Sequence, residues 1–351
     1  MRRKQRLLAL PRGVERGLRI GILGICGSVL TACSASTSHE PSEPAVQAGS
    51  PRRGSEAGSS QGVGARGNSD LGEPCAAKEQ PAAPRTDAPT DGMGLVPGGR
   101  VQLGASEADL RKLVEVSQAD GLRWSRADLG SATPTRQVVL AAYYLDLYPV
   151  SVKAYARCVD AGACTEPNMA DCSDPEFATW GKPKYAEHPV NCVSWKQAMT
   201  YCDSRGARLP TLDEWEFAAR GPEGRLFPWG DTPASQLQSR VGNFADRSFA
   251  ASPESAGLFP VVSYDDGYAR TSPVGAFPAG ASPFGHLDMA GGIGEMTNSP
   301  NFSERQCARR GGSWGQPPVA AASVFEDFYN PDYGSPHTAF RCARTAAAAA
   351  K

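Results

Sequence analysis

The chain has 351 residues with 36 basic and 37 acidic side chains, which give a formal net charge of −1 at pH 7. Residues 1–32 hold seven of the basic residues and one acid, so their removal leaves a net charge of −7. Because nucleic-acid binding depends on basic side chains that neutralise phosphates, this charge argues against a nucleic-acid partner.

The first 32 residues have the features of a targeting segment. Basic residues crowd the first 19 positions, and Ile20–Leu30 is an apolar stretch too short to cross a bilayer as a normal helix. Leu30–Cys33 matches the cleavage box of a bacterial lipoprotein, in which Cys33 becomes the lipidated first residue and anchors the chain on a membrane. Ser34, and not an acidic residue, follows the cysteine, which favours the outer membrane of the cell envelope as the destination. The sequence does not indicate which face of that membrane carries the protein. The alternative is an ordinary secretory signal with an incidental cysteine.

A low-complexity stretch separates this signal peptide from the main domain. Residues 33–91 are mostly Ser, Gly, Pro, Ala and charged residues, with almost no large apolar side chain. Such a segment cannot bury enough surface to offset its chain entropy, so we predict a disordered tether. Residues 92–345 are long enough for one large domain with its own core, and residues 346–351 are predicted to be a disordered tail.

The domain opens with alternating strand and helix signals. Two short apolar runs around a Pro-Gly-Gly turn in Gly94–Gly104 predict a hairpin. Ser106 can cap the helix that follows, Gln137–Tyr148 reads as a strand, and Ser151 can cap a helix that ends near Gly162.

Two further helices have clear boundaries. Ser194–Gln197 and Thr211–Glu214 both fit the capping box, in which a hydroxyl accepts an amide at the helix start and the longer side chain reaches back. Gly206 and Gly221 fit the C-terminal stops. Beyond Gly221 the chain is rich in Gly, Pro, Asp and Ser, so we expect irregular loops held by disulfides or bound cations.

Four motifs occur in the order found in one known family. They are Arg208–Gly221 (RLPTLDEWEFAARG), Phe284–Gly291 (FGHLDMAG), Arg309–Trp314 (RRGGSW) and Phe340–Arg344 (FRCAR). Over roughly Gly94–Arg344 the chain therefore resembles the formylglycine-generating enzyme (sulfatase-modifying factor) family. The resemblance implies an α+β fold distantly like that of C-type lectins, with little regular secondary structure, long loops and stabilising disulfides.

Cysteine usage favours a disulfide-bonded, exported domain. With Cys26 lost in the signal and Cys33 lipidated, an even number remains: Cys75, Cys158, Cys164, Cys172, Cys192, Cys202, Cys307 and Cys342. An even number in an exported protein favours disulfides over free thiols. Zinc is the weaker alternative, because the four histidines are scattered and no Cys-x-x-Cys occurs.

Spacing does not fix how these cysteines pair. The resemblance implies a bond between Cys202 and Cys342, which would contribute on the order of 4 to 5 kcal/mol by closing a long loop. For the other cysteines two pairings stay open. Cys158 would bond to Cys164 or to Cys172, and Cys192 would bond to whichever of those two is left.

The resemblance also implies two calcium sites, built from the carboxylate and carbonyl oxygens that calcium prefers. The first would use the side chains of Asn243 and Asp266 with the carbonyls of Phe244 and Tyr268. The second would use Asp288, the carbonyls of Gly291 and Ile293, and Glu295. The alternative for the second is that Asp288 and Glu295 are ordinary turn and surface acids, since the chain lacks two aromatic residues that the family has there.

The catalytic motif of the family is altered. Family enzymes oxidise a cysteine of a client sulfatase to formylglycine with dioxygen and a copper(I) ion held by two cysteines. The corresponding positions here are Gln316 and Ala321, and neither can supply the thiolate that copper(I) selects. Copper is therefore not expected, and Cys307, which precedes the turn, is predicted to be a disulfide partner.

Three functions remain open. The favoured one is a lipid-anchored, catalytically silent binding or scaffold module for a protein or glycan. The second is a formylglycine-generating-type oxidoreductase that acts on a client cysteine through residues not identified, and the third is a structural envelope lipoprotein. Two unpaired cysteines, or a set of His and carboxylate side chains, that converge near Ser313 would favour the enzyme.

A ligand of such a module would occupy a cleft rich in aromatic side chains. Its predicted lining is Ser313, Trp314, Gln316, Phe325, Phe328, Tyr329 and Tyr333. The alternative is that these aromatic residues are plain core.

Overall fold

The computed structural model describes residues 92–129, 134–253, 263–301 and 306–346. The predicted signal peptide, the lipidated Cys33, the tether to residue 91 and the tail from residue 347 lie outside these ranges. No helix within them is long and apolar enough to cross a membrane.

The predicted hairpin at the start of the domain is wrong. Strand β1 (Met93–Val96) pairs antiparallel with β4 (Tyr143–Asp146), and β2 (Gly99–Leu103) pairs antiparallel with β3 (Arg136–Leu140). The register is the same in both ladders, so the two segments form one long ribbon that bends between its halves. The predicted strand Gln137–Tyr148 is thereby split in two.

Gly98 explains why the glycine-rich turn became a bend. A Cβ atom at this position would lie only 2.4 Å from the backbone nitrogen of Ala142 on the opposite strand. The glycine therefore permits close approach of two distant segments, where the local signal had suggested a reversal of the chain.

The helices begin where their capping residues predict. The capping residues Ser106, Ser151, Ser194 and Thr211 precede α1 (Glu107–Ala119), α2 (Val152–Asp160), α3 (Trp195–Ser204) and α4 (Leu212–Arg220). The full capping box forms at α1, α3 and α4, which confirms both predicted boxes. A short helix α5 (Arg247–Ala250) and six 3₁₀ turns punctuate the described loops: Met169–Asp171, Pro175–Phe177, Pro183–Tyr185, Ala234–Gln236, Pro278–Gly280 and Pro318–Ala321.

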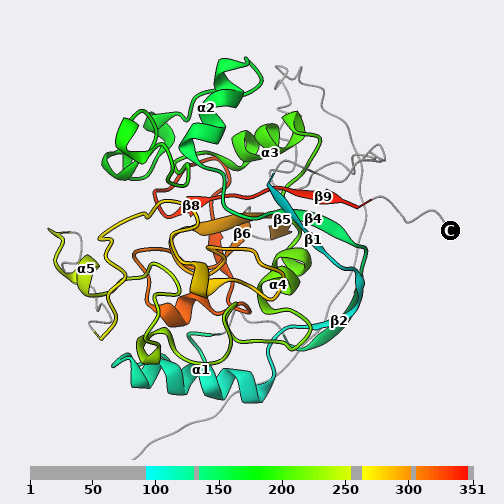
Figure 1. Cartoon of the computed structure of the whole chain (residues 1–351), viewed down its shortest axis with the longest axis vertical. Helices are drawn as coiled ribbons and strands as arrows, with labels where there is room; N and C mark the ends of the chain where they lie inside the picture. Colours follow the sequence, from blue (N-terminus) through cyan, green and yellow to red (C-terminus); the bar gives the residue numbers. More distant parts are fainter. Residues whose placement is uncertain (1–91, 130–133, 254–262, 302–305, 347–351) are drawn as a thin grey trace, which may run out of the picture. The chain divides into compact units, whose positions relative to one another are not determined.

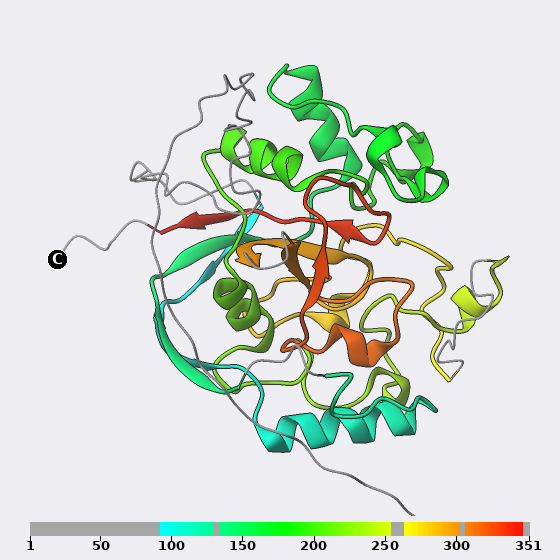
Figure 2. The ribbon, with the colours of Figure 1, turned by 180° about the vertical axis from the view of Figure 1, so that it is seen from behind.

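A four-stranded sheet forms the centre of the domain. Its order is β7 (Asp327–Tyr329), β6 (Gln306–Arg310), β5 (Gly294–Asn301) and β8 (Thr338–Ala339), with β5 and β8 parallel and the other pairs antiparallel. A smaller sheet joins β1, β4 and the last strand β9 (Ala343–Thr345). Helices α2 and α3 lie on one side of the central sheet and α1 on the opposite side (Figures 1 and 2).

Disulfides tie the loops together as predicted. The bonds are Cys158–Cys164, Cys172–Cys192 and Cys202–Cys342. The last confirms the pair implied by the resemblance and joins α3 to the segment before β9. Cys307 is also disulfide-bonded, as predicted. The α+β fold with few helices, short strands and long loops is thus confirmed.

Candidate functional site

The double-glycine turn after β6 sets the position of Ser313 and Trp314. Gly311 and Gly312 have φ of 93° and 66°, in the left-handed region that favours glycine. A Cβ on Gly311 would lie 3.0 Å from the carbonyl oxygen of Met289. The turn carries the next two side chains inward, so that only 2% of Ser313 and 3% of Trp314 is exposed.

Ser313 lies in a small, partly buried cluster that includes His337. The Ser313 Oγ lies 3.2 Å from His337 Nδ1, and its hydroxyl donates to Gln316 Oε1 at 3.3 Å. The indole of Trp314 stacks on the imidazole of His337, with ring centroids 4.3 Å apart. Sequence reasoning had set His337 aside as one of four scattered histidines, because no local pattern links it to a turn 24 residues earlier.

The two positions that hold copper in the family are occupied by groups that do not fit copper. Ala321 is fully buried in a cluster with Val241 and Phe244, and the backbone oxygen of Gln316 accepts the amide of Ala245 at 2.9 Å. All seven cysteines in the described ranges are disulfide-bonded. Within those ranges no three His, Cys, Asp or Glu side chains form a group that could hold a metal. Soft thiolate ligands are therefore absent from the described part of the site.

The predicted aromatic lining is divided among separate parts of the core. Trp314 packs against Phe249 and Phe177, with centroids 5.9 and 6.1 Å away. Tyr329 is buried in a different cluster, which includes side chains of α2 and α3. Phe325 packs on Trp124. Phe328 is half-buried on β7, and Tyr333 is 57% exposed. Packing thus assigns Trp314 and Tyr329 to the core, which corrects the picture of one shared cleft.

We predict that His337 makes stability depend on pH. Burial, with the charge of Arg309, lowers the pKa of His337 from 6.5 to about 4. Between these values the unfolded chain binds a proton that the folded protein does not, so the free energy of unfolding falls as pH drops from 6.5 to 4, by up to about 3 kcal/mol. A His337→Gln variant has no imidazole to protonate, so its free energy of unfolding does not undergo this fall. The difference in free energy of unfolding between wild type and variant, measured by urea titration, should therefore become smaller as pH drops from 6.5 to 4.

Other groups also titrate, so the comparison with the variant is essential. Burial lowers the pKa of His286 to about 4, which acts in the same direction. Burial raises the pKa of Asp266 to about 8 and of Asp288 to about 6, which acts in the opposite direction because the folded protein then holds the extra proton. A difference between wild type and His337→Gln that stays constant from pH 7 to pH 4.5 would contradict the role of His337.

Four of the predicted calcium ligands line one small cavity of about 10 Å³. They are Asn243, Asp288, Gly291 and Ile293, drawn from both predicted sites. The Oδ1 atoms of Asn243 and Asp288 are buried and have no hydrogen-bond partner among the described residues. Asp288 also has a left-handed backbone, with φ of 57°. Unpartnered buried oxygens are costly, so their convergence on one cavity is notable.

The other predicted ligands are engaged elsewhere. Both oxygens of Asp266 accept backbone amides, from Phe244 at 2.8 Å and Tyr268 at 2.7 Å. The amide of Asp266 in turn donates to Asp246, a buried acid that sequence reasoning missed. Burial and the charge of Asp246 raise the pKa of Asp266 to about 8. The predicted carbonyl ligands Phe244 and Tyr268 thus contact Asp266 through their amides.

Glu295 is neither exposed nor part of the cavity that contains Asp288. Its two oxygens accept hydrogen bonds from Arg341 Nε and Nη2, each at 2.6 Å, and Oε2 also accepts the indole N–H of Trp215 at 2.6 Å. Glu295 and Arg341 are both fully buried. The alternative that Glu295 is a surface acid is therefore wrong, and its carboxylate holds the β5 strand to the final segment of the domain.

Comparison with known proteins agrees with this fold. The family model described as "Sulfatase-modifying factor enzyme 1-like domain" matches residues 78–346. The formylglycine-generating enzyme of Bos taurus is 28% identical over 288 residues, which cover 72% of this chain and 73% of that protein. The protein of Bos taurus named "Inactive C-alpha-formylglycine-generating enzyme 2" is 29% identical over 297 residues, covering 72% and 88%.

A solved structure supports the fold independently. PvdO from Pseudomonas aeruginosa matches with a TM-score of 0.51 and 21% identity, over 72% of this chain and 94% of that one. At this identity the match speaks to the fold alone. The family model, the motifs and the fold lead to one conclusion: the chain belongs to the family of sulfatase-modifying factor enzyme 1-like domains, whose members include formylglycine-generating enzymes.

Proposed function

We propose that this protein is a non-catalytic binding or scaffold module on the sulfatase-modifying factor fold, exported and anchored to the cell envelope by lipid. One observation carries the proposal: Gln316 and Ala321 occupy the positions of the family's copper cysteines, and every cysteine in the described ranges is already in a disulfide. A relative of similar identity is itself named an inactive enzyme, so loss of the reaction has a precedent in the family. The partner is a protein or glycan and, given the mature charge of −7, not a nucleic acid.

Copper(I) titration with a product assay tests this proposal. The mature chain from Cys33 onward is titrated with copper(I), then incubated with oxygen and a peptide that carries the sulfatase cysteine motif. We expect no stoichiometric copper binding and no aldehyde, because the described part of the domain offers no free thiolate. An active formylglycine-generating enzyme is the positive control. Tight copper with aldehyde formation would overturn the proposal and establish the alternative, an oxidoreductase acting on a client cysteine.

Calcium is proposed to stabilise the loops of this module. The cavity that contains Asn243 and Asp288 fits a hard cation, because a carboxylate oxygen and an amide oxygen are both buried there without a partner. Glu295 is left out of the proposed ligand set because Arg341 and Trp215 use both of its oxygens.

We predict that calcium raises the melting temperature of wild type and has little effect on an Asp288→Asn variant. At a free concentration one hundred times the Kd, calcium would add about 2.7 kcal/mol to the free energy of unfolding. Differential scanning calorimetry with and without a chelator measures the shift. The control Asp203→Asn removes an exposed acid on α3 and should leave the shift unchanged. An equal calcium shift in Asp288→Asn would exclude this cavity.

Membrane attachment is proposed to depend on Cys33. The lipoprotein box and the disulfides, which persist in oxidising compartments, support export to the cell envelope, with the outer membrane favoured by Ser34. In cell fractionation we expect the wild type with the membranes and a Cys33→Ala variant in soluble fractions or unprocessed. Membrane association that survives Cys33→Ala would refute lipid anchoring at this residue.

A further inference from the structure

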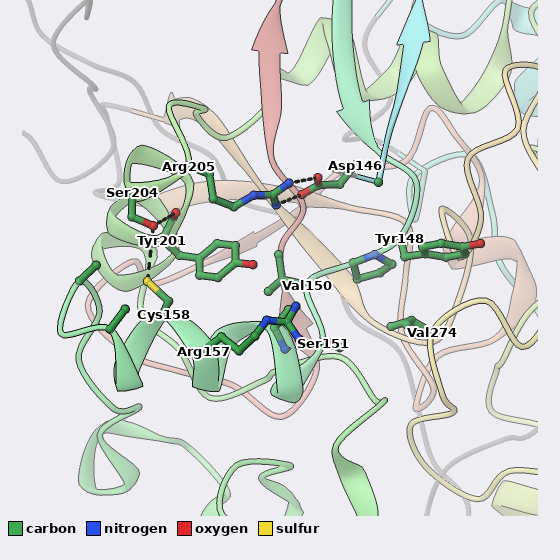
Figure 3. A pocket seen from close by; sticks show the side chains of 15 residues that line it. Asp146, Tyr148, Val150, Ser151, Arg157, Cys158, Tyr201, Ser204, Arg205 and Val274 are labelled. Carbon is green, nitrogen blue, oxygen red and sulfur yellow. Dashed lines mark hydrogen bonds and ion pairs between the residues drawn. The ribbon is translucent and has the colours of Figure 1, made fainter. Parts of the chain in front are cut away.

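An open hollow of about 520 Å³ lies beside helices α2 and α3, at residues that neither the Ser313 cluster nor the calcium cavity uses. Helix α2 contributes a face through Ala154, Arg157 and Cys158, while Tyr201 comes from α3 and Arg205 from the residue that caps its C-terminal end. Figure 3 shows Arg157 and Cys158 opposite Tyr201 and Arg205, with Tyr148 and Val274 at the far end of the hollow. Two helices thus form the sides of the hollow, and the Cys158–Cys164 disulfide links the end of α2 to the loop that follows it.

The charges around the hollow are unbalanced. Arg205 forms a two-pronged ion pair with Asp146, with nitrogen–oxygen distances of 3.0 and 2.9 Å. Asp146 is the only acid among the described residues that line the hollow, and it also accepts the amide of Cys342 at 2.8 Å. Arg157 is exposed, and its side chain makes no hydrogen bond or ion pair within the described ranges. One positive charge is therefore left without a counter-charge, at the edge of an otherwise neutral wall.

The two arginines lie near the same tyrosine. The guanidinium of Arg205 lies 5.7 Å from the centroid of the Tyr201 ring. Burial raises the pKa of Tyr201, and the positive charges of Arg205 and Arg157 act against this rise. In Figure 3 the Tyr201 ring lies between them. Because Asp146 pairs with Arg205, a ligand anion in this hollow would find its counter-charge on Arg157.

The remaining lining decides between a peptide and a sugar. Carbohydrates are commonly held on an open aromatic face, but Tyr201 is only 6% exposed, stacks on Tyr155 with ring centroids 5.5 Å apart and has Arg205 over its ring. The one exposed aromatic residue among the described residues of the lining is Tyr148, which is 39% exposed and lies at the far end of the hollow from Arg157 (Figure 3). The wall is formed instead by small apolar groups: Val150, Ala154, Ala161, Ala163 and Val274. Such a wall suits short aliphatic side chains, which gain from burial against it.

We infer that this hollow binds a peptide segment that carries a carboxylate, with the carboxylate on Arg157 and small apolar side chains against Ala154, Ala161 and Val274. The inference rests on the proposed function, since it names the ligand class of the binding module. The mature chain is acidic overall, so attraction of an acidic peptide is local to this hollow and depends strongly on Arg157.

Fluorescence anisotropy with two matched peptides tests the inference. The probes are a fluorescein-labelled octapeptide of alternating alanine and glutamate and the same peptide with glutamine for glutamate. At low ionic strength, wild type should bind the glutamate peptide at least about tenfold more tightly than the glutamine peptide, and 0.5 M salt should abolish the preference. An Arg157→Gln variant should lose the preference, while its melting temperature stays at the wild-type value because the side chain is exposed.

Arg111→Gln is the matched control. Arg111 is also an exposed helical arginine without an ion pair in the described ranges, but it lies on α1, on the other side of the central sheet. This variant should keep the full preference for glutamate.

Three results would overturn the inference. They are a wild type that binds neither peptide up to millimolar concentration, equal affinity for both peptides, and a preference that survives Arg157→Gln. A heparin-derived oligosaccharide is run in parallel, and Arg157-dependent binding of that probe alone would replace the peptide by an anionic glycan. Each of these outcomes is distinct from copper binding or aldehyde formation, which bear on the proposed function itself.

Discussion

Replacing Arg341 by methionine is expected to lower the free energy of unfolding by about 3–5 kcal/mol. The guanidinium is fully buried and donates to both oxygens of Glu295 at 2.6 Å. It also donates to the backbone oxygens of Asp146 at 2.9 Å and Leu287 at 2.8 Å. Its removal leaves the Glu295 carboxylate buried without a counter-charge and frees carbonyls on two other segments. Urea-induced unfolding followed by tryptophan fluorescence measures the loss.

Two further variants test whether the loss of stability in Arg341→Met comes from the unpaired buried charge or from any loss of an arginine ion pair. Arg341→Met/Glu295→Met removes both charges, so it should be less destabilised than the sum of the two single variants, although Trp215 then loses its acceptor. Arg126→Met breaks an exposed, solvent-screened ion pair with Glu107 and should leave the free energy of unfolding close to the wild-type value. A loss below about 1 kcal/mol for Arg341→Met would contradict the assignment of Arg341 as a central tie of the fold.

Removing the Cys202–Cys342 disulfide should cost about 5 kcal/mol, while removing Cys158–Cys164 should cost about 2 kcal/mol. The two bonds close loops of very different length, since their sequence separations are 140 and 6. In the chain-entropy account a longer loop restricts the unfolded chain more, so its loss releases more entropy. Double Cys→Ala variants of each pair, compared with wild type by urea unfolding, measure the two costs.

The order of the two stability losses tests this prediction more strictly than either value alone. Both replace two buried cysteines by alanine, so the loss of apolar contact is similar and largely cancels in the comparison. If the Cys158–Cys164 variant were as unstable as the Cys202–Cys342 variant, loop closure would not be the source of the stabilisation. The Cys158–Cys164 variant also tests whether this bond shapes the peptide hollow, because Cys158 lines it.

Parts of this fold that depend on near neighbours in the sequence were predictable. The capping box at a helix start needs only a hydroxyl and a Glu or Gln side chain three residues later. Ser194 and Thr211 therefore predicted the starts of α3 and α4 correctly. Strand partners are different, because any extended segment offers the same backbone donors and acceptors. The Pro-Gly-Gly signal therefore suggested a hairpin, while β1 and β2 in fact pair with strands more than thirty residues away.

The candidate sites show the same division. The replacement of the copper cysteines by Gln316 and Ala321 could be read directly, because it follows from residue identity at counted positions. The meeting of Ser313 with His337, and of Asn243 with Asp288, could not, because each depends on the path of an irregular loop. Glu295 was expected to bind a cation, yet a buried arginine from the last motif neutralises it.

The sequence by itself determined the helix starts and the motifs that identify the family, and the family resemblance then implied the Cys202–Cys342 bond and the replacement of the copper cysteines. Only the tertiary structure decided the bent ribbon, the buried Arg341–Glu295 pair and the hollow that leaves Arg157 without a counter-charge. The physical reason is range. Capping and residue chemistry act within one helical turn or one side chain, whereas pairing, burial and charge balance depend on which distant segments the folded chain brings into contact.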